Sequence, residues 1–77
     1  METTMNNMKI GETAKVLRLE LPKSAGRRLQ DIGLIAGTKV FCALKSPSGD
    51  PKAFLIRGAV IAIREEDGAG VVVEKVI

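Results

Sequence analysis

Short runs of β-branched and aliphatic residues, separated at close intervals by Gly- and Pro-containing turns, dominate this sequence. Strands this short and this evenly spaced are typical of a small antiparallel barrel or sandwich. A sheet of this kind protects its edges by curling. The runs that we expect to form strands are residues 11–21, 38–45, 53–57, 59–64 and 71–77.

The length and composition fix how such a domain is built. A chain of 77 residues makes one small domain at most, and a domain of this size buries only about 60% of its unfolded surface. Aromatic residues make up 3% of the chain against 45% for all hydrophobic residues, so the core must be aliphatic. Residues 1–8 are polar and rich in asparagine. We therefore expect a disordered N-terminal tail over 1–8 and the folded domain over 9–77.

The first expected strand has an apolar pattern that changes phase. Leu17, Leu19 and Leu21 alternate with polar residues, whereas Ala14 and Val16 have the opposite parity. A bulge or a strong twist between Val16 and Leu17 would let both sets point into the core. The sequence therefore predicts an irregularity at this point of the strand.

A short helix is predicted between the first two strands. Pro22 cannot donate to a strand ladder and ends the first strand, and Ser24 is expected to cap the helix. Gly33 stands where a helix favours a left-handed residue, and Leu34 follows as the apolar residue that packs back. The helical face is formed by Ala25, Leu29 and Ile32, spaced i, i+4, i+7.

The second half of the chain reads as strands joined by tight turns. In the run 38–45, Val40, Cys42 and Leu44 share one parity and are expected on one face. Residues 46–51 and 65–70 have the composition of exposed turns. Gly58 is expected to form a tight hairpin between the runs 53–57 and 59–64.

Charge and cysteine content exclude several classes of protein. The net charge is only +3 and the basic residues are scattered, which gives no nucleic-acid footprint. The single cysteine excludes an internal disulfide scaffold. The longest apolar run, 59–63, is far short of the roughly 20 residues of a membrane span. The N-terminus does not read as a signal peptide, so we expect a cytoplasmic protein.

The side chains needed for catalysis or tight metal binding are missing. The sequence has no His, the usual base beside a nucleophile and a preferred ligand of ferrous iron. Cys42 lies mid-strand and reads as a small buried apolar residue. The acidic residues 65–67 read as a solvated turn. We expect no enzyme, no cofactor and no tight metal site.

Four motifs, in order along the chain, resemble those of the FeoA family. The run RRLQDIGLIAG at 27–37 resembles the signature RRLxDLGLxPG, and PSGDP at 47–51 resembles the family's PLGDP turn. Residues 56–64 resemble its VRGxxLALR stretch, and Gly11, Glu12, Ala14 and Val16 fit its opening. Ala36 and Ser48 depart from the family pattern. The resemblance spans residues 11–76.

This resemblance implies an SH3-like barrel that acts in ferrous iron uptake as a small cytosolic partner of FeoB, a membrane transporter with a GTP-binding domain. No membrane insertion and no contact with nucleic acid are expected. A similar domain ends the iron-dependent repressors, so a role in transcription is the alternative, and a metal-responsive switch is a third hypothesis. We expect partner binding by Leu21, Ala25, Arg27, Arg28, Leu34 and Ile35, and structural turns at Gly33, Gly37 and Gly58.

Overall fold

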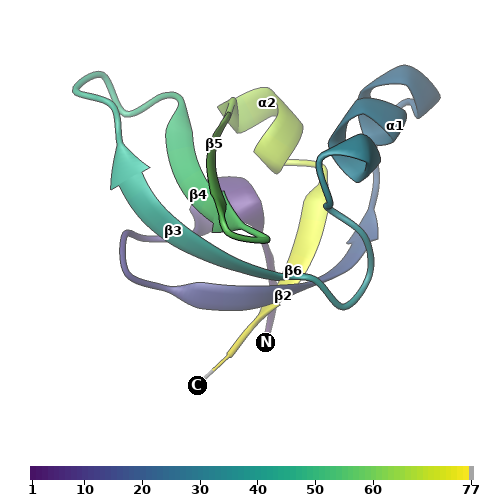
Figure 1. Ribbon diagram of the computed structural model, residues 1–77, viewed down its shortest axis with the longest axis horizontal. Coiled ribbons are helices and arrows are strands. Elements are labelled where there is room, and N and C mark those ends of the chain that lie inside the picture. Colours follow the sequence, from purple (N-terminus) through teal and green to yellow (C-terminus); the bar gives the residue numbers. More distant parts are fainter. Residues whose placement is uncertain (77) are drawn as a thin grey trace.

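A computed structural model, which describes residues 1–76, shows one strongly curved antiparallel sheet (Figure 1). Within these residues the sheet has six strands in the order β1-β6-β2-β3-β4-β5. A 3-10 helix, η1, follows β1; α1 lies between β2 and β3, and α2 between β5 and β6. The bounds are β1 Glu2–Thr4, η1 Met5–Asn7, β2 Thr13–Leu19, α1 Lys23–Asp31, β3 Lys39–Lys45, β4 Lys52–Ile56, β5 Ala59–Ile63, α2 Glu65–Gly68 and β6 Val71–Lys75.

The prediction of a disordered tail over residues 1–8 is wrong. β1 pairs with β6, and Met5 and Met8 are completely buried. The Lys52 ammonium donates to the carbonyl oxygens of Asn6 and Met8, each at 2.7 Å. A polar composition concealed this segment because its two methionines, rather than a periodic apolar pattern, fix it to the core. The folded unit therefore begins at β1.

The predicted irregularity in the first strand is confirmed. Along β2 the register against β6 shifts between Val16 and Arg18, so Leu17 is the extra residue of a bulge. Ala14 and Val16 are buried before the bulge, and Leu19 packs partly against the core after it. The switch in parity of the apolar residues thus marks the bulge, after which residues of the opposite parity face the core.

Helix α1 ends as predicted but begins differently. The Leu34 N–H donates to the Leu29 carbonyl at 3.1 Å, and the Gly33 N–H donates to the Gln30 carbonyl at 2.9 Å. These bonds form a Schellman motif, which requires the left-handed φ of 108° found at Gly33. The N-cap is Pro22, without a side-chain cap, so the expected capping by Ser24 is wrong. At the other expected turn glycines, φ is 92° for Gly37 and 83° for Gly58.

A second bulge changes one face assignment. The register of β3 against β4 shifts between Cys42 and Leu44. Val40 and Cys42 are buried as expected, but 62% of Leu44 is exposed. The expectation that Leu44 shares their face is wrong, because the extra residue at Ala43 turns Leu44 outward.

The rest of the second half follows the predicted pattern with one addition. Arg57 and Gly58 form the two-residue turn of the β4–β5 hairpin, with φ of 50° and 83°, the geometry of a type I′ turn. Residues 65–68, expected as an irregular turn, form the single helical turn α2. Ile77, at the end of the last expected strand, lies outside the described residues.

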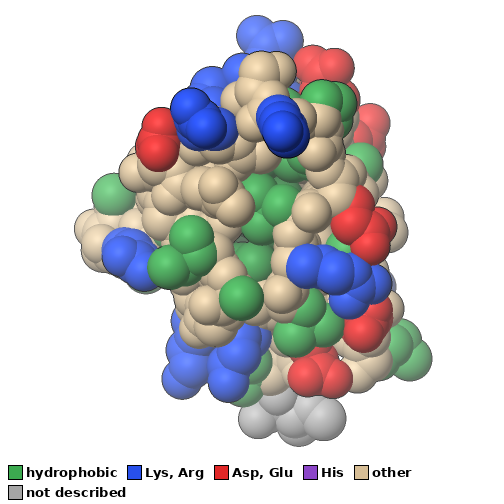
Figure 2. All heavy atoms as spheres, turned by 90° about the vertical axis from the view of Figure 1, so that its right-hand side faces the viewer, with side chains coloured by type: hydrophobic (Ala, Val, Ile, Leu, Met, Phe, Trp, Pro, Cys, Tyr) green, Lys and Arg blue, Asp and Glu red, His purple; other side chains and the backbone are tan. Residues whose placement is uncertain are grey.

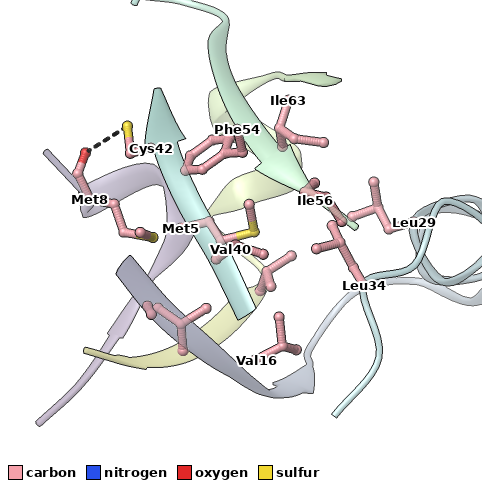
Figure 3. Packing of buried hydrophobic residues seen from close by; sticks show 13 residues of the cluster. Met5, Met8, Val16, Leu29, Leu34, Val40, Cys42, Phe54, Ile56 and Ile63 are labelled. Atoms are coloured by element: carbon pink, nitrogen blue, oxygen red, sulfur yellow. Dashed lines mark hydrogen bonds between the residues drawn. The ribbon is translucent and has the colours of Figure 1, made fainter. Parts of the chain in front are cut away.

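The core is aliphatic, as the composition indicates. Figure 3 shows Met5 and Met8 of the N-terminal segment in one cluster with side chains of the sheet, among them Cys42 and Phe54. Val71 and Val73 of β6 belong to the same cluster. Leu29 and Leu34 join it from α1 and the turn that follows. Phe54 is the largest fully buried side chain. Anchoring by Leu29 and Leu34 fixes α1 to the barrel and so positions its outer side.

Glu12 gives the fold a pH-dependent element. The Lys9 backbone N–H donates to its carboxylate at 2.8 Å, and Lys75 lies 3.1 Å away. These contacts lower the pKa of Glu12, so its stabilising effect is present above the unfolded pKa and is lost as pH falls through the folded pKa. We expect Glu12→Gln to flatten the acid limb of a stability–pH profile. An unchanged limb would contradict this role.

Candidate docking surface

An open groove of about 720 Å³ lies between the end of β2 and α1. Leu19 and Leu21 supply apolar side chains, and both also pack partly against the core. Lys23 and Arg27 bring positive charge from α1. The full lining is Leu19, Leu21, Lys23, Ser24, Gly26, Arg27 and Gln30. Apolar side chains beside Arg27 match the composition of protein interfaces, in which Arg is enriched.

The shape of this groove is visible from the side on which α1 lies. Figure 2 shows hydrophobic side chains recessed below a group of Lys and Arg side chains at the top of the molecule. Two acidic partners, Glu2 and Glu20, hold Arg18 at 3.2 Å and 2.8 Å, and raise its pKa, with Glu20 as the larger cause. By contrast, Lys23 and Arg27 make no ion pair within residues 1–76. Their charge is therefore available to an acidic partner.

A close approach between β2 and β6 positions Leu21. The Glu20 N–H donates to the Gly70 carbonyl at 2.6 Å. A Cβ atom at Gly70 would lie 2.3 Å from Leu21 Cδ2 and 2.8 Å from the Glu20 carbonyl oxygen. Only glycine at this position lets Leu21 lie against the backbone just before β6. The groove is thus set by backbone contact and not by side chains alone.

The six predicted partner-binding residues do not form one surface. Leu21 and Arg27 line the groove, and Ala25 is half-buried in α1. Arg28 instead forms an ion pair with Asp67 at 3.1 Å. Ile35 is 43% exposed, on the loop after α1.

Leu34 cannot belong to a docking surface. It is fully buried in the core, because the Schellman turn at Gly33 directs it inward. This corrects its assignment as a partner-binding residue. Of the two apolar residues after the helix, only Ile35 reaches the surface.

Sequence reasoning missed five residues of the groove: Leu19, Lys23, Ser24, Gly26 and Gln30. The alternation of Leu19 with polar residues predicts a core position, whereas after the bulge at Leu17 its side chain is only half-buried. The helical spacing of Lys23, Arg27 and Gln30 (i, i+4, i+7) was a signal that could have placed them on one face. Gly26 gives no such signal.

No group of three or more His, Cys, Asp or Glu side chains that could hold a metal ion occurs among residues 1–76. Cys42 is fully buried, and its Sγ lies 3.9 Å from the Met8 carbonyl oxygen. Burial is the largest cause that raises the pKa of this thiol. Cys42 thus packs as a core residue, as the sequence predicts.

Native Cys42 is expected to resist thiol reagents. A buried thiol with a raised pKa must be exposed by opening of the barrel before it ionises and reacts. We expect its labelling by a chromogenic disulfide reagent at neutral pH to be about a hundredfold slower than in denaturant. Equal rates in the two conditions would contradict this burial.

None of the helices in the described part of the chain is long and apolar enough to cross a membrane.

Comparison with known families decides the identity. The family model described as the FeoA domain matches residues 3–75. The chain belongs to the FeoA family. The match includes most of the N-terminal segment, in agreement with the place of β1 in the sheet of this FeoA domain.

Solved structures with this fold include other FeoA proteins. FeoA from Chlorobium tepidum has a TM-score of 0.91 at 27% identity, and the match covers 97% of this chain and 71% of that one. FeoA from Stenotrophomonas maltophilia, solved with zinc, has a TM-score of 0.83 at 25% identity, over 94% and 89% of the two chains. It is described as a prokaryotic SH3-domain protein and a candidate activating factor of ferrous iron transport. The SH3-like fold class expected from the sequence is confirmed.

The fold also occurs in metal-dependent repressors. IdeR of T. acidophilum has a TM-score of 0.85 at 18% identity, with coverage of 97% of this chain but only 34% of that one. At this identity the likeness shows the fold alone. No curated protein matches this FeoA domain in sequence.

Proposed function

We propose that this FeoA domain is a cytoplasmic, non-enzymatic accessory protein that docks on a FeoB-type ferrous iron transporter and modulates it. The family is linked to ferrous iron transport, and the groove under α1 supplies the docking site. The observation that carries the proposal is this groove, with Leu19 and Leu21 beside the uncompensated charges of Lys23 and Arg27.

The groove favours an acidic and apolar segment of the partner. Leu19 and Leu21 offer apolar area that is only partly covered, and burial of such area drives association. Lys23 and Arg27 would attract carboxylates and orient the segment. SH3-like domains commonly bind extended segments in surface grooves. A cytoplasmic segment of the transporter is the partner that fits both the family and the groove.

The repressor-like alternative rests on fold likeness alone. In the IdeR chain this fold covers about a third of the molecule, and the net charge of +3 is small for a DNA-binding domain. Salt-dependent binding of duplex DNA would favour it. A metal-responsive switch would require a ferrous ion to shift specific amide signals at low stoichiometry.

Reversal of the charge at Arg27 is expected to weaken docking about tenfold, as removal of one attractive and addition of one repulsive contact at an interface can do. Lys45→Glu is the matched control, because Lys45 is also exposed but lies at the end of β3, outside the groove. Binding of both variants to the transporter's cytoplasmic domain would be measured by calorimetry. Equal affinity of Arg27→Glu and wild type, with both folded, would remove the groove from the interface.

A further inference from the structure

The two edges of the sheet formed by residues 1–76 differ in how they are protected. β1 has three residues, and its Glu2 pairs with Arg18. β5 has five residues, Ala59–Ile63, that are all apolar, without a charge, a proline or a bulge. Proteins usually protect strand edges with such devices. The β5 edge lacks them and is open to another strand.

The turn geometry tells which backbone groups of β5 are free. Arg57 and Gly58 form a two-residue hairpin turn, so the flanking pair Ile56–Ala59 exchanges hydrogen bonds. Bonding and non-bonding pairs alternate along an antiparallel ladder. Val60 and Ala62 therefore direct their N–H and C=O groups away from β4. The next carbonyl along, that of Arg64, already accepts the N–H groups of Asp67 and Gly68 at 3.1 Å and 2.9 Å.

A row of apolar side chains on the outer face of the sheet ends at this edge. Phe41 lies opposite Leu55, and Leu55 lies opposite Val60. Their exposed fractions are 37%, 40% and 59%, increasing toward the edge. A row of this kind ends at β5 without a neighbour to cover Val60.

A groove of about 610 Å³ runs beside the C-terminal half of the same edge. One wall is the β5 side, at Ala62 and Ile63, and the other is α1, at Leu29 and Ile32. Its charged lining has both signs: Glu66 and Asp67 come from α2, and Arg28 and Arg64 are basic. Asp67 is already paired with Arg28 at 3.1 Å. Glu66 makes no ion pair among residues 1–76, so the groove can receive an apolar segment with a positive charge that lies near Glu66.

We propose that the occupant is a second copy of this chain, whose β5 pairs antiparallel with β5 across a two-fold axis at Ile61. In this register Val60 of each copy lies opposite Ala62 of the other, so all four free N–H and C=O pairs are used. The large Val60 side chain meets the small Ala62 side chain on the outer face. The same surface serves both copies, as a two-fold dimer requires.

The residues that flank β5 include charges of opposite sign, Arg57 before the strand and Glu65 after it. Because Arg57 lies in the turn before the strand and Glu65 begins α2 after it, antiparallel pairing brings the Arg57 end of each strand next to the Glu65 end of the other. The hairpin tip with Arg57 then lies near Glu66 in the groove of the other copy, where Asp67 stays paired with Arg28. This opposition of charge, repeated twice by symmetry, favours a second copy over an unrelated strand.

This dimer goes beyond the proposed docking on the transporter and uses none of the residues of the groove under α1. Its formation can therefore be tested on the purified protein alone.

Sedimentation equilibrium is expected to show a monomer–dimer equilibrium. Ala62→Pro removes the N–H directed at the partner and keeps the pairing with β4, since proline is tolerated on a strand edge. We expect it to weaken the dimer at least about tenfold. Arg57→Glu and Glu65→Arg should each weaken it about tenfold, and the double variant should restore it. If Ala62→Pro does not fold, the variants Arg57→Glu and Glu65→Arg and their combination decide whether this dimer forms.

Disulfide trapping tests the register. In a Cys42→Ala background, Ile61→Cys places two thiols at the two-fold axis, on a non-bonded pair with Cα atoms about 4.5 Å apart, within the range of disulfides. Val60→Cys is the matched control, because it is more exposed but is offset from its own symmetry mate. We expect rapid oxidation to a covalent dimer only for Ile61→Cys.

Three results would overturn the proposal. They are a monomer up to millimolar concentration, a dimer that Ala62→Pro and the charge variants leave unchanged, or equal trapping of the two cysteine variants. A monomer whose β5 amides respond to the transporter's cytoplasmic segment would assign the edge to a partner strand instead.

Discussion

Removal of residues 1–8 is expected to unfold this FeoA domain. The deletion takes away β1, two fully buried methionines and the two carbonyls that bind the Lys52 ammonium. Loss of one buried methionine alone costs about 2–5 kcal/mol. A domain of this size has a total stability on the order of 4–12 kcal/mol, so loss of both leaves little or none.

Circular dichroism and thermal unfolding of the truncated chain would show this loss directly. A matched pair of point variants separates burial from length: Met5→Ala should lower the free energy of unfolding by about 3 kcal/mol. Met1→Ala should leave it unchanged, because Met1 is 90% exposed. A truncated chain with a cooperative transition at the wild-type temperature would contradict the place of this segment in the core.

Gly70→Ala is expected to destabilise the domain by about 3 kcal/mol, at the upper end for overpacking. The new methyl group would overlap Leu21 and lie 2.8 Å from the Glu20 carbonyl, which is backbone and cannot rotate away. Gly26→Ala is the control: nothing lies within 4 Å of its Cβ position. Since Gly26 is within α1, that change should stabilise by about 0.5–1 kcal/mol.

Chemical unfolding of the two glycine variants gives opposite signs if the close approach between β2 and β6 exists. Because the displaced side chain is Leu21, Gly70→Ala should also weaken docking in the groove. Gly26→Ala is a control for stability only, since Gly26 itself lines the groove. Equal stability of Gly70→Ala and wild type would show that this contact is not tight.

The elements with strong local signals were predictable from the sequence. The change of phase at Val16 and Leu17 indicated the bulge in β2, and Gly33 with Leu34 indicated the end of α1. In each case a local backbone requirement selects the residue type. The hairpin at Gly58 follows the same rule.

Features that depend on contacts between distant segments were not predictable. Met5 and Met8 have no periodic pattern, and their segment is ordered by contacts with distant residues: core packing, the pairing of β1 with β6 and the hydrogen bonds of Lys52. The second bulge, before Leu44, has no marker in the sequence and turns that side chain outward. The positions of these residues are set by contacts that exist only in the folded barrel.

The location of the candidate site was predicted better than the set of residues that line it. Leu21 and Arg27 lie in the groove as the pattern at α1 indicated. Arg28 does not line the groove, because its guanidinium donates to the carboxylate of Asp67, 39 residues later in the sequence. Leu34 does not line the groove either, because the turn that ends α1 directs its side chain into the core. Which residues line a surface site depends on contacts between residues that are distant in the sequence. The sequence alone does not show which of these residues come into contact.

The most direct test of docking is an amide NMR titration of the labelled FeoA domain with the GTP-binding domain of its own FeoB, and then with the intact transporter in nanodiscs. We predict that the shifts cluster over residues 19–30, around the groove under α1, with dimer-edge residues 59–63 little affected. Shifts confined to other faces would move the site, and no shift with either form of the transporter would contradict docking itself.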